Sequence, residues 1–128
     1  MSARLRILYV DDEPDIRQVA KMALELESGF EVEACGSGEE ALARLARTKP
    51  DLVMLDVMMP QMDGPMTLAA LRRISGCEQL PVVFITAKVQ RHEIERFRKL
   101  GATDVIAKPF DPMTLARQVR GIWEKLHA

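Results

Sequence analysis

The chain has 128 residues, which fits one globular domain of ordinary size, and 48% of them are hydrophobic and 29% charged. A formal net charge of −1 argues against the basic surface that binds nucleic acid, and no apolar run approaches the length of a membrane span. The two cysteines, Cys35 and Cys77, lack the spacing of a metal site, so we expect free thiols in the reducing cytoplasm.

Short apolar runs and amphipathic stretches alternate along the chain. The apolar runs predict strands at residues 5–10, 30–34, 52–55, 81–86 and 104–107. Apolar residues at helical spacing predict helices after these strands, at residues 14–27, 37–45, 64–74, 89–100 and 111–126. There is no internal repeat, low-complexity segment or linker, so one domain over residues 1–128 is expected.

Capping residues mark the starts of several predicted helices. Pro14 suits the first turn of the first helix, and Ser37 with Glu40 forms a capping box at the start of the second. Asp111 is expected to cap the last helix, with Pro112 in its first turn. These signals support helices in the intervals between the predicted strands.

The repeated order of strand and helix predicts the architecture. Strands that alternate with helices form a parallel sheet covered on both faces, because each parallel connection needs a crossover. We therefore expect an α/β fold of the flavodoxin-like, doubly wound type, with a five-stranded parallel sheet in the order 2-1-3-4-5 and five helices. The carboxyl ends of all the strands then share one edge, which is where such sheets bind ligands.

Polar residues follow four of the predicted strands at this edge. They are Asp11, Asp12, Asp56, Thr86 and Lys108. Carboxylates that converge on one place repel each other and raise each other's pKa values unless a cation is present. Carboxylate oxygens are ligands that Mg²⁺ prefers, which makes Mg²⁺ the expected cofactor.

The same residues suit phosphoryl chemistry. Lys108 adds a positive charge and Thr86 a hydroxyl group, which together with a divalent ion would bind phosphoryl oxygens. A carboxylate placed among these groups, here that of Asp56, can act as the nucleophile and form an aspartyl phosphate. For residues 51–64 taken alone, an Asp56 that only caps a loop is the alternative interpretation.

The chain resembles the receiver domain of two-component response regulators, of the single-domain type. The residues that carry the resemblance are Asp11-Asp12, Asp56, Pro60, Asp63-Gly64, Thr86-Ala87 and Lys108-Pro109-Phe110. They occur in the expected order at the ends of predicted strands, and the resemblance spans essentially the whole chain.

The resemblance implies that Asp56 accepts a phosphoryl group from a phosphohistidine of a sensor histidine kinase or a histidine phosphotransfer protein. Thr86 and Lys108 would contact the phosphoryl oxygens, and the Lys108-Pro109 peptide would be cis. The implied metal ligands are Asp11, Asp12, Asp56 and the backbone carbonyl of Met58.

Phosphorylation would then alter the face formed by the fourth helix, the fifth strand and the fifth helix. That face would bind a downstream protein, and a homodimer through it is a further implied partner. The domain would be a switch that catalyses only its own phosphorylation and slow dephosphorylation, and it would not be a turnover enzyme.

Three positions bear on how such a switch works in this chain. Val105 stands where most receivers have a Tyr or Phe, and a valine cannot swing a ring toward Thr86, so output is expected to rely on the loop at residues 86–90. Met58 and Lys88 border the path of an attacking water. Met58 has no group that orients water, and Lys88 adds a second positive charge, which predicts slow self-dephosphorylation.

Other functions compete with the receiver interpretation. A phosphatase of the haloacid-dehalogenase type also uses an Asp nucleophile, but Met58 stands where its second acid belongs. A nucleotide or flavin module needs a glycine-rich loop, whereas acids at 11–13 follow the first strand. A non-phosphorylated adaptor would lack some of the expected acid, hydroxyl or amine groups, and none is missing. A stand-alone receiver and an excised part of a larger regulator both stay open.

Overall fold

The computed structural model describes residues 4–127 and shows strands and helices in strict alternation. The strands are β1 (Leu5–Val10), β2 (Phe30–Cys35), β3 (Leu52–Asp56), β4 (Val82–Thr86) and β5 (Asp104–Ala107). The helices are α1 (Pro14–Glu25), α2 (Gly38–Arg47), α3 (Gly64–Leu71), α4 (Arg91–Lys99) and α5 (Leu115–Leu126).

Neighbouring strands of the sheet pair in parallel, in the order β2-β1-β3-β4-β5. The predicted flavodoxin-like strand order is therefore confirmed. Val10 is in register with Leu55, and Leu55 with Phe84, so the carboxyl ends of the three central strands lie at one level. This alignment brings the residues that follow those strands to a common edge.

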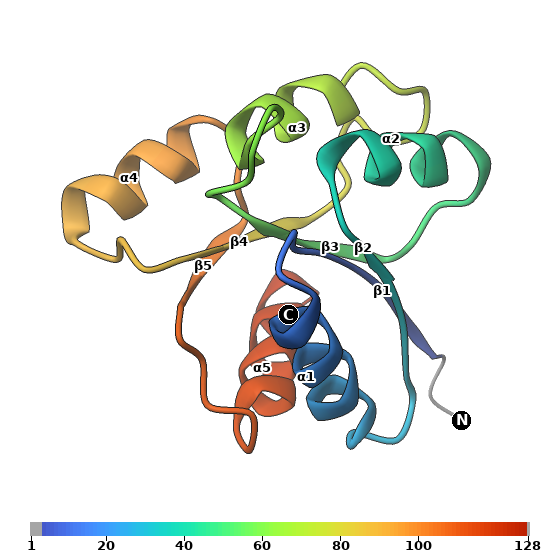
Figure 1. Ribbon diagram of the computed structural model, residues 1–128, viewed down its shortest axis with the longest axis vertical. Coiled ribbons are helices and arrows are strands. Elements are labelled where there is room, and N and C mark those ends of the chain that lie inside the picture. Colours follow the sequence, from blue (N-terminus) through green and yellow to red (C-terminus); the bar gives the residue numbers. More distant parts are fainter. Residues whose placement is uncertain (1–3, 128) are drawn as a thin grey trace.

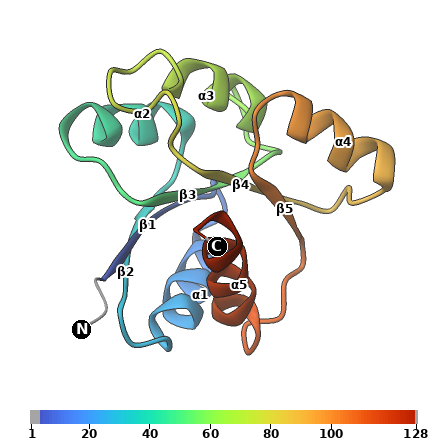
Figure 2. The same cartoon turned by 180° about the vertical axis from the view of Figure 1, so that it is seen from behind.

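The helices cover both faces of the sheet. Helices α1 and α5 lie on one face, and α2, α3 and α4 lie on the other (Figure 1), as the reverse view also shows (Figure 2). Because both faces are covered, every residue of β3 and of β4 is buried. This burial explains why these strands read as continuous apolar runs in the sequence.

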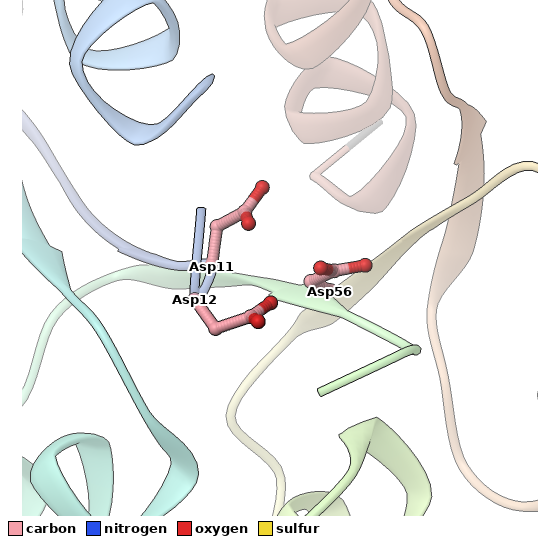
Figure 3. Close-up of side chains that lie close together, drawn as sticks. All are labelled: Asp11, Asp12 and Asp56. Carbon is pink, nitrogen blue, oxygen red and sulfur yellow. The ribbon is translucent and has the colours of Figure 1, made fainter. Parts of the chain in front are cut away.

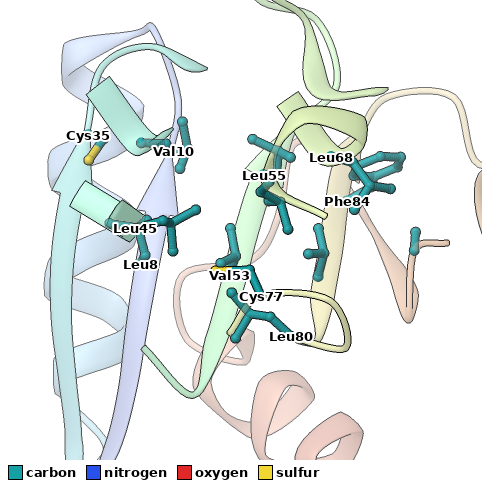
Figure 4. Close-up of a cluster of buried hydrophobic side chains, with 14 of the residues drawn as sticks. Leu8, Val10, Cys35, Leu45, Val53, Leu55, Leu68, Cys77, Leu80 and Phe84 are labelled. Carbon is teal, nitrogen blue, oxygen red and sulfur yellow. The ribbon is translucent and has the colours of Figure 1, made fainter. Parts of the chain in front are cut away.

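Two apolar cores separate the sheet from its two helix layers. The core under α2, α3 and α4 includes Leu55, Leu68 and Phe84 (Figure 4). In it the ring of Phe97 packs edge-on against Phe84, with the ring centroids 5.1 Å apart. The second core, under α1 and α5, includes Tyr9, Met54, Ile85, Ile106 and Leu115. Alternate residues of each strand contribute to opposite cores, as expected for buried strands.

The capping box predicted at α2 is present. The Ser37 hydroxyl oxygen accepts a hydrogen bond from the Glu40 N–H at 3.1 Å, and the Glu40 carboxylate accepts one from the N–H of Gly36 at 2.9 Å. The prediction for α5 is wrong by one turn, because the helix begins at Leu115. Asp111 instead closes a turn, in which its carboxylate accepts the N–H of Met113 and its carbonyl accepts the N–H of Leu115.

Other predicted helix bounds also differ from the structure by a few residues. Helix α3 ends at Leu71, because Arg73 and Ile74 donate to carbonyls three residues back and the chain tightens into turns. Helix α4 begins at Arg91, which leaves Val89 exposed in the preceding loop. None of the helices between residues 4 and 127 has the length and hydrophobicity that a bilayer span demands.

Candidate functional site

Asp11, Asp56 and Lys108 come together at the carboxyl edge of the sheet. Each follows by two positions a residue of the core under α1 and α5, namely Tyr9, Met54 and Ile106. Because alternate residues of a strand point to the same face, the three side chains extend the same side of the sheet. Both carboxylates are deeply buried, with Asp11 0% and Asp56 2% exposed.

The Lys108 ammonium group is the centre of an ion-pair network. Its Nζ lies 3.2 Å from Asp11 Oδ2, 3.2 Å from Asp56 Oδ2 and 3.0 Å from Glu13 Oε1. An ammonium has three N–H donors, so all of them have a carboxylate partner. The ion pair of Glu13 with Lys108 was not predicted from the sequence, although the place of Glu13 directly after Asp11 and Asp12 is a signal that could have identified it.

The carboxylates of Asp11, Asp12 and Asp56 form a cluster that suits a hard cation. One oxygen from each lies within 4.8 Å of the others, and Figure 3 shows the three side chains gathered at the ends of β1 and β3. Asp12 is half-buried, so this cluster remains open to solvent on one side. A set of oxygen donors, partly open to water, matches the preference of Mg²⁺ for carboxylates and retained waters.

The surroundings of Asp56 in this cluster make its ionisation less favourable. Burial, together with the negative charge of Asp11, raises the pKa of Asp56 to about 6, although Lys108 opposes the shift. Burial acts to lower the pKa of Lys108, but its hydrogen bonds to Glu13 and Asp11 outweigh this effect, so that pKa is raised. Lys108 therefore stays positively charged, and a bound cation would favour the ionised form of Asp56.

Thr86 occupies the same edge but on the other side of β4. It follows Phe84 of the opposite core by two positions, and it is buried. Its hydroxyl oxygen accepts a hydrogen bond from the Lys88 N–H at 3.0 Å. Within residues 4–127 no hydrogen bond joins this hydroxyl to the carboxylates. The half-buried Val105 packs against the same core as Phe84.

Met58 takes part in the site through its backbone. Its N–H lies 3.4 Å from Asp56 Oδ1, in a long hydrogen bond, while the residue as a whole is 68% exposed. Asp56 therefore also holds its own loop, as the loop-capping interpretation proposed, but it does so with one oxygen while the other meets Lys108. The Lys108-Pro109 peptide is cis, as expected.

Two residues that the sequence did not single out contact Asp11. The buried Tyr9 hydroxyl donates to Asp11 Oδ2 at 3.2 Å, and the Arg17 guanidinium donates to the Asp11 carbonyl at 2.8 Å. The spacing of Tyr9 two residues before an acid on one strand face is a signal for the first contact. Arg17 lies in α1, just after the acids, but nothing in the sequence pattern indicates which carbonyl it reaches.

The sequence model of the response regulator receiver domain matches residues 7–120 of this chain. The chain belongs to the response regulator receiver domain family. Among its relatives, the DNA-binding response regulator MtrA of Mycolicibacterium smegmatis is 38% identical over 117 residues, which cover 91% of this chain and 50% of MtrA. The response regulator Rre1 of Synechocystis is 35% identical over 128 residues, 100% of this chain and 55% of Rre1.

Solved structures of receivers share the fold. The chemotaxis response regulator CheY4 of Vibrio cholerae superposes with a TM-score of 0.86 at 32% identity, over 94% of this chain and 99% of CheY4. A response regulator from Chloroflexus aurantiacus, described as putative, gives a TM-score of 0.83 at 30% identity, over 94% and 98% of the two chains.

Family membership decides between the functions that the sequence left open. This receiver is a signalling module of two-component systems rather than a classical enzyme, so the phosphatase and the adaptor are not favoured. Receivers of this family bind Mg²⁺ at an acidic pocket and interact with histidine kinases or phosphotransfer proteins. The chain spans about half the length of the curated relatives it matches.

Proposed function

We propose that residues 1–128 act in the cytoplasm as one phosphoacceptor receiver domain in which Asp56 is the nucleophile. The observation that carries this proposal is the position of its carboxylate, which is buried among acids and 3.2 Å from the Lys108 ammonium. A carboxylate oxygen of Asp56 forms a bond to phosphorus while the bond from phosphorus to the phosphohistidine nitrogen breaks. The imidazole of the donor protein is the leaving group.

Mg²⁺ would be held by Asp11, Asp12, Asp56 and the backbone carbonyl of Met58. The fit is supported by the clustered oxygens of the three acids, which without a cation repel each other. The ion supplies positive charge that offsets the charge on the phosphoryl oxygens. The domain catalyses only its own phosphorylation and slow dephosphorylation.

Lys108 and Thr86 are the two groups that would contact the phosphoryl oxygens. The Lys108 ammonium, which stays protonated, shifts part of its hydrogen bonding from the carboxylates to the new anion. The Thr86 hydroxyl turns toward the phosphoryl group, which removes the acceptor of the Lys88 N–H and so disturbs the loop before α4. The face formed by α4, β5 and α5 then changes its affinity for a downstream protein or a second copy of the chain.

Phosphorylation by a small donor tests this function. Incubation with Mg²⁺ and acetyl phosphate is expected to add one phosphoryl group to the wild type, read as intact mass, and none to Asp56→Asn. Asp51→Asn is the matched control, because Asp51 lies at the opposite end of β3 and its carboxylate accepts the N–H of Arg6, its one hydrogen bond within residues 4–127. An adduct of equal yield on Asp56→Asn, or none on the wild type, contradicts the proposal.

A further inference from the structure

Tyr9 is the single tyrosine of the chain, and it lies in β1 with no solvent exposure. Its ring belongs to the apolar core under α1 and α5, together with Leu5 and Ile7 of β1. Its hydroxyl donates a hydrogen bond to Asp11 Oδ2 at 3.2 Å. Asp11 is the one hydrogen-bond partner of this hydroxyl among residues 4–127.

The hydroxyl of Tyr9 lies in an apolar core, where a polar group is unfavourable without a hydrogen bond. Burying a hydroxyl is unfavourable unless it forms a hydrogen bond, and a phenylalanine would fill the same space without that cost. The hydroxyl here bonds to a carboxylate of the acidic cluster, which is itself 0% exposed. The structure therefore connects the rigid core of the sheet directly to one member of the cluster.

The other hydrogen bonds of Asp11 show what this connection does. Its Oδ1 accepts the N–H of Glu13 at 2.9 Å, and its Oδ2 accepts from both Tyr9 and Lys108. Lys108 has a long side chain with several rotatable bonds and also contacts Glu13 and Asp56. Under the proposed function it would contact the incoming phosphoryl group. Tyr9 is fixed by packing, so its hydrogen bond holds Asp11 Oδ2 whichever partners Lys108 has.

We propose that Tyr9 is a positioning residue of the Mg²⁺ site, whose hydroxyl fixes the orientation of the Asp11 carboxylate from within the core. This inference rests on the proposed function, since it assumes that the acidic cluster binds Mg²⁺. Groups that orient the ligands of a metal typically change its affinity by 10- to 100-fold when they are removed. Tyr9 acts through Asp11 and touches neither the phosphoryl group nor the donor.

Tyr9→Phe keeps the ring and removes only the hydroxyl. We expect it to weaken Mg²⁺ binding by about tenfold, measured by calorimetric titration of the unphosphorylated protein with MgCl₂. In the acetyl phosphate reaction it should raise the Mg²⁺ concentration for half-maximal rate by a similar factor and leave the rate at saturating Mg²⁺ nearly unchanged. A purely structural role would not produce this split.

Thr103→Val is the matched control. It also removes a hydroxyl that forms a hydrogen bond, in this case with the N–H of Val82 at 3.3 Å, but at the opposite end of β4. Its Mg²⁺ affinity should equal that of the wild type. Equal affinities of the wild type and Tyr9→Phe would overturn the role of Tyr9 and leave the metal site standing, whereas no Mg²⁺ binding by the wild type would overturn both.

A second measurement needs no variant in the core. Because Tyr9 is the single tyrosine, protein labelled with ¹³C at the tyrosine ζ-carbon gives one NMR signal, which reports on the phenol oxygen. This signal should shift during a MgCl₂ titration, with the same midpoint as the calorimetric curve. A signal that stays in place while the calorimeter records binding would overturn the proposal, even if Tyr9→Phe failed to fold.

Discussion

At the scale of single residues, the ionised and buried carboxylate of Asp56 destabilises the metal-free domain. Its pKa is about 6 in the folded protein, against an ordinary value of 3.8, chiefly because it is buried. Between these two values the folded state retains a proton that the unfolded chain has released. Stability therefore falls as pH rises through this interval, and the cost is fully developed above about pH 6.

Asp56→Asn should consequently stabilise the protein near neutral pH. In magnesium-free buffer at about pH 7.5 we expect its free energy of unfolding to exceed that of the wild type by roughly 1–3 kcal/mol, measured by urea denaturation. The difference should shrink toward about pH 4, where Asp56 of the wild type is itself neutral in the folded state. A variant that is no more stable at about pH 7.5, or a difference that grows on acidification, would contradict this account.

At the scale of elements, the junction of β3 and α3 fixes where Asp56 stands. Gly64, the first residue of α3, donates its N–H to the Val57 carbonyl at 2.9 Å. A Cβ at this position would lie 2.8 Å from the Asp56 carbonyl oxygen and 2.8 Å from Val57 Cα, both backbone atoms. The helix can approach the strand so closely only because residue 64 has no side chain.

Gly64→Ala should therefore displace the end of β3. We expect a loss of about 1–3 kcal/mol in the free energy of unfolding, as for overpacked cores, and a lower rate of phosphorylation by acetyl phosphate. Gly121→Ala is the control, because a Cβ there meets nothing within 4 Å and alanine favours the helix α5. If the two variants unfolded at the same urea concentration, the close approach of α3 to the end of β3 at Gly64 would not contribute to stability.

The helices and strands also show which features of the fold could be predicted from the sequence. Buried strands such as β3 were predictable because both faces are covered, so that the four residues before Asp56 form a continuous apolar run. The start of α2 was predictable from the local pair Ser37 and Glu40. The start of α5 was not, because an Asp followed by Pro can close a turn as readily as it can cap a helix, and Asp111 does the former.

At the scale of the whole molecule, the parallel direction of the strands places all their carboxyl ends at one edge, and this made the meeting of Asp11, Asp56 and Lys108 predictable. Contacts that depend on the length and direction of a side chain were not predictable. The hydrogen bond from the Arg17 guanidinium to the Asp11 carbonyl is of this kind. The strand order determines which residues lie near one another, whereas side-chain packing determines which of them form contacts.

Mg²⁺ should stabilise the entire domain, because Asp11, Asp12 and Asp56 come together only when β1 and β3 are paired. A ligand that binds only the folded state adds RT ln(1 + [L]/Kd), about 2.7 kcal/mol at a concentration of 100 Kd. We expect MgCl₂ to raise the wild-type free energy of unfolding accordingly, EDTA to reverse the effect, and Asp56→Asn to gain much less.

Saturating Mg²⁺ should thus narrow or invert the stability difference between the wild type and Asp56→Asn that holds in metal-free buffer. The reason is that the ion relieves the repulsion that the substitution otherwise removes. NaCl at matched ionic strength is the control, because screening alone acts on both proteins. Equal gains of the two proteins in MgCl₂ would show that Asp56 does not contribute to the binding of the ion.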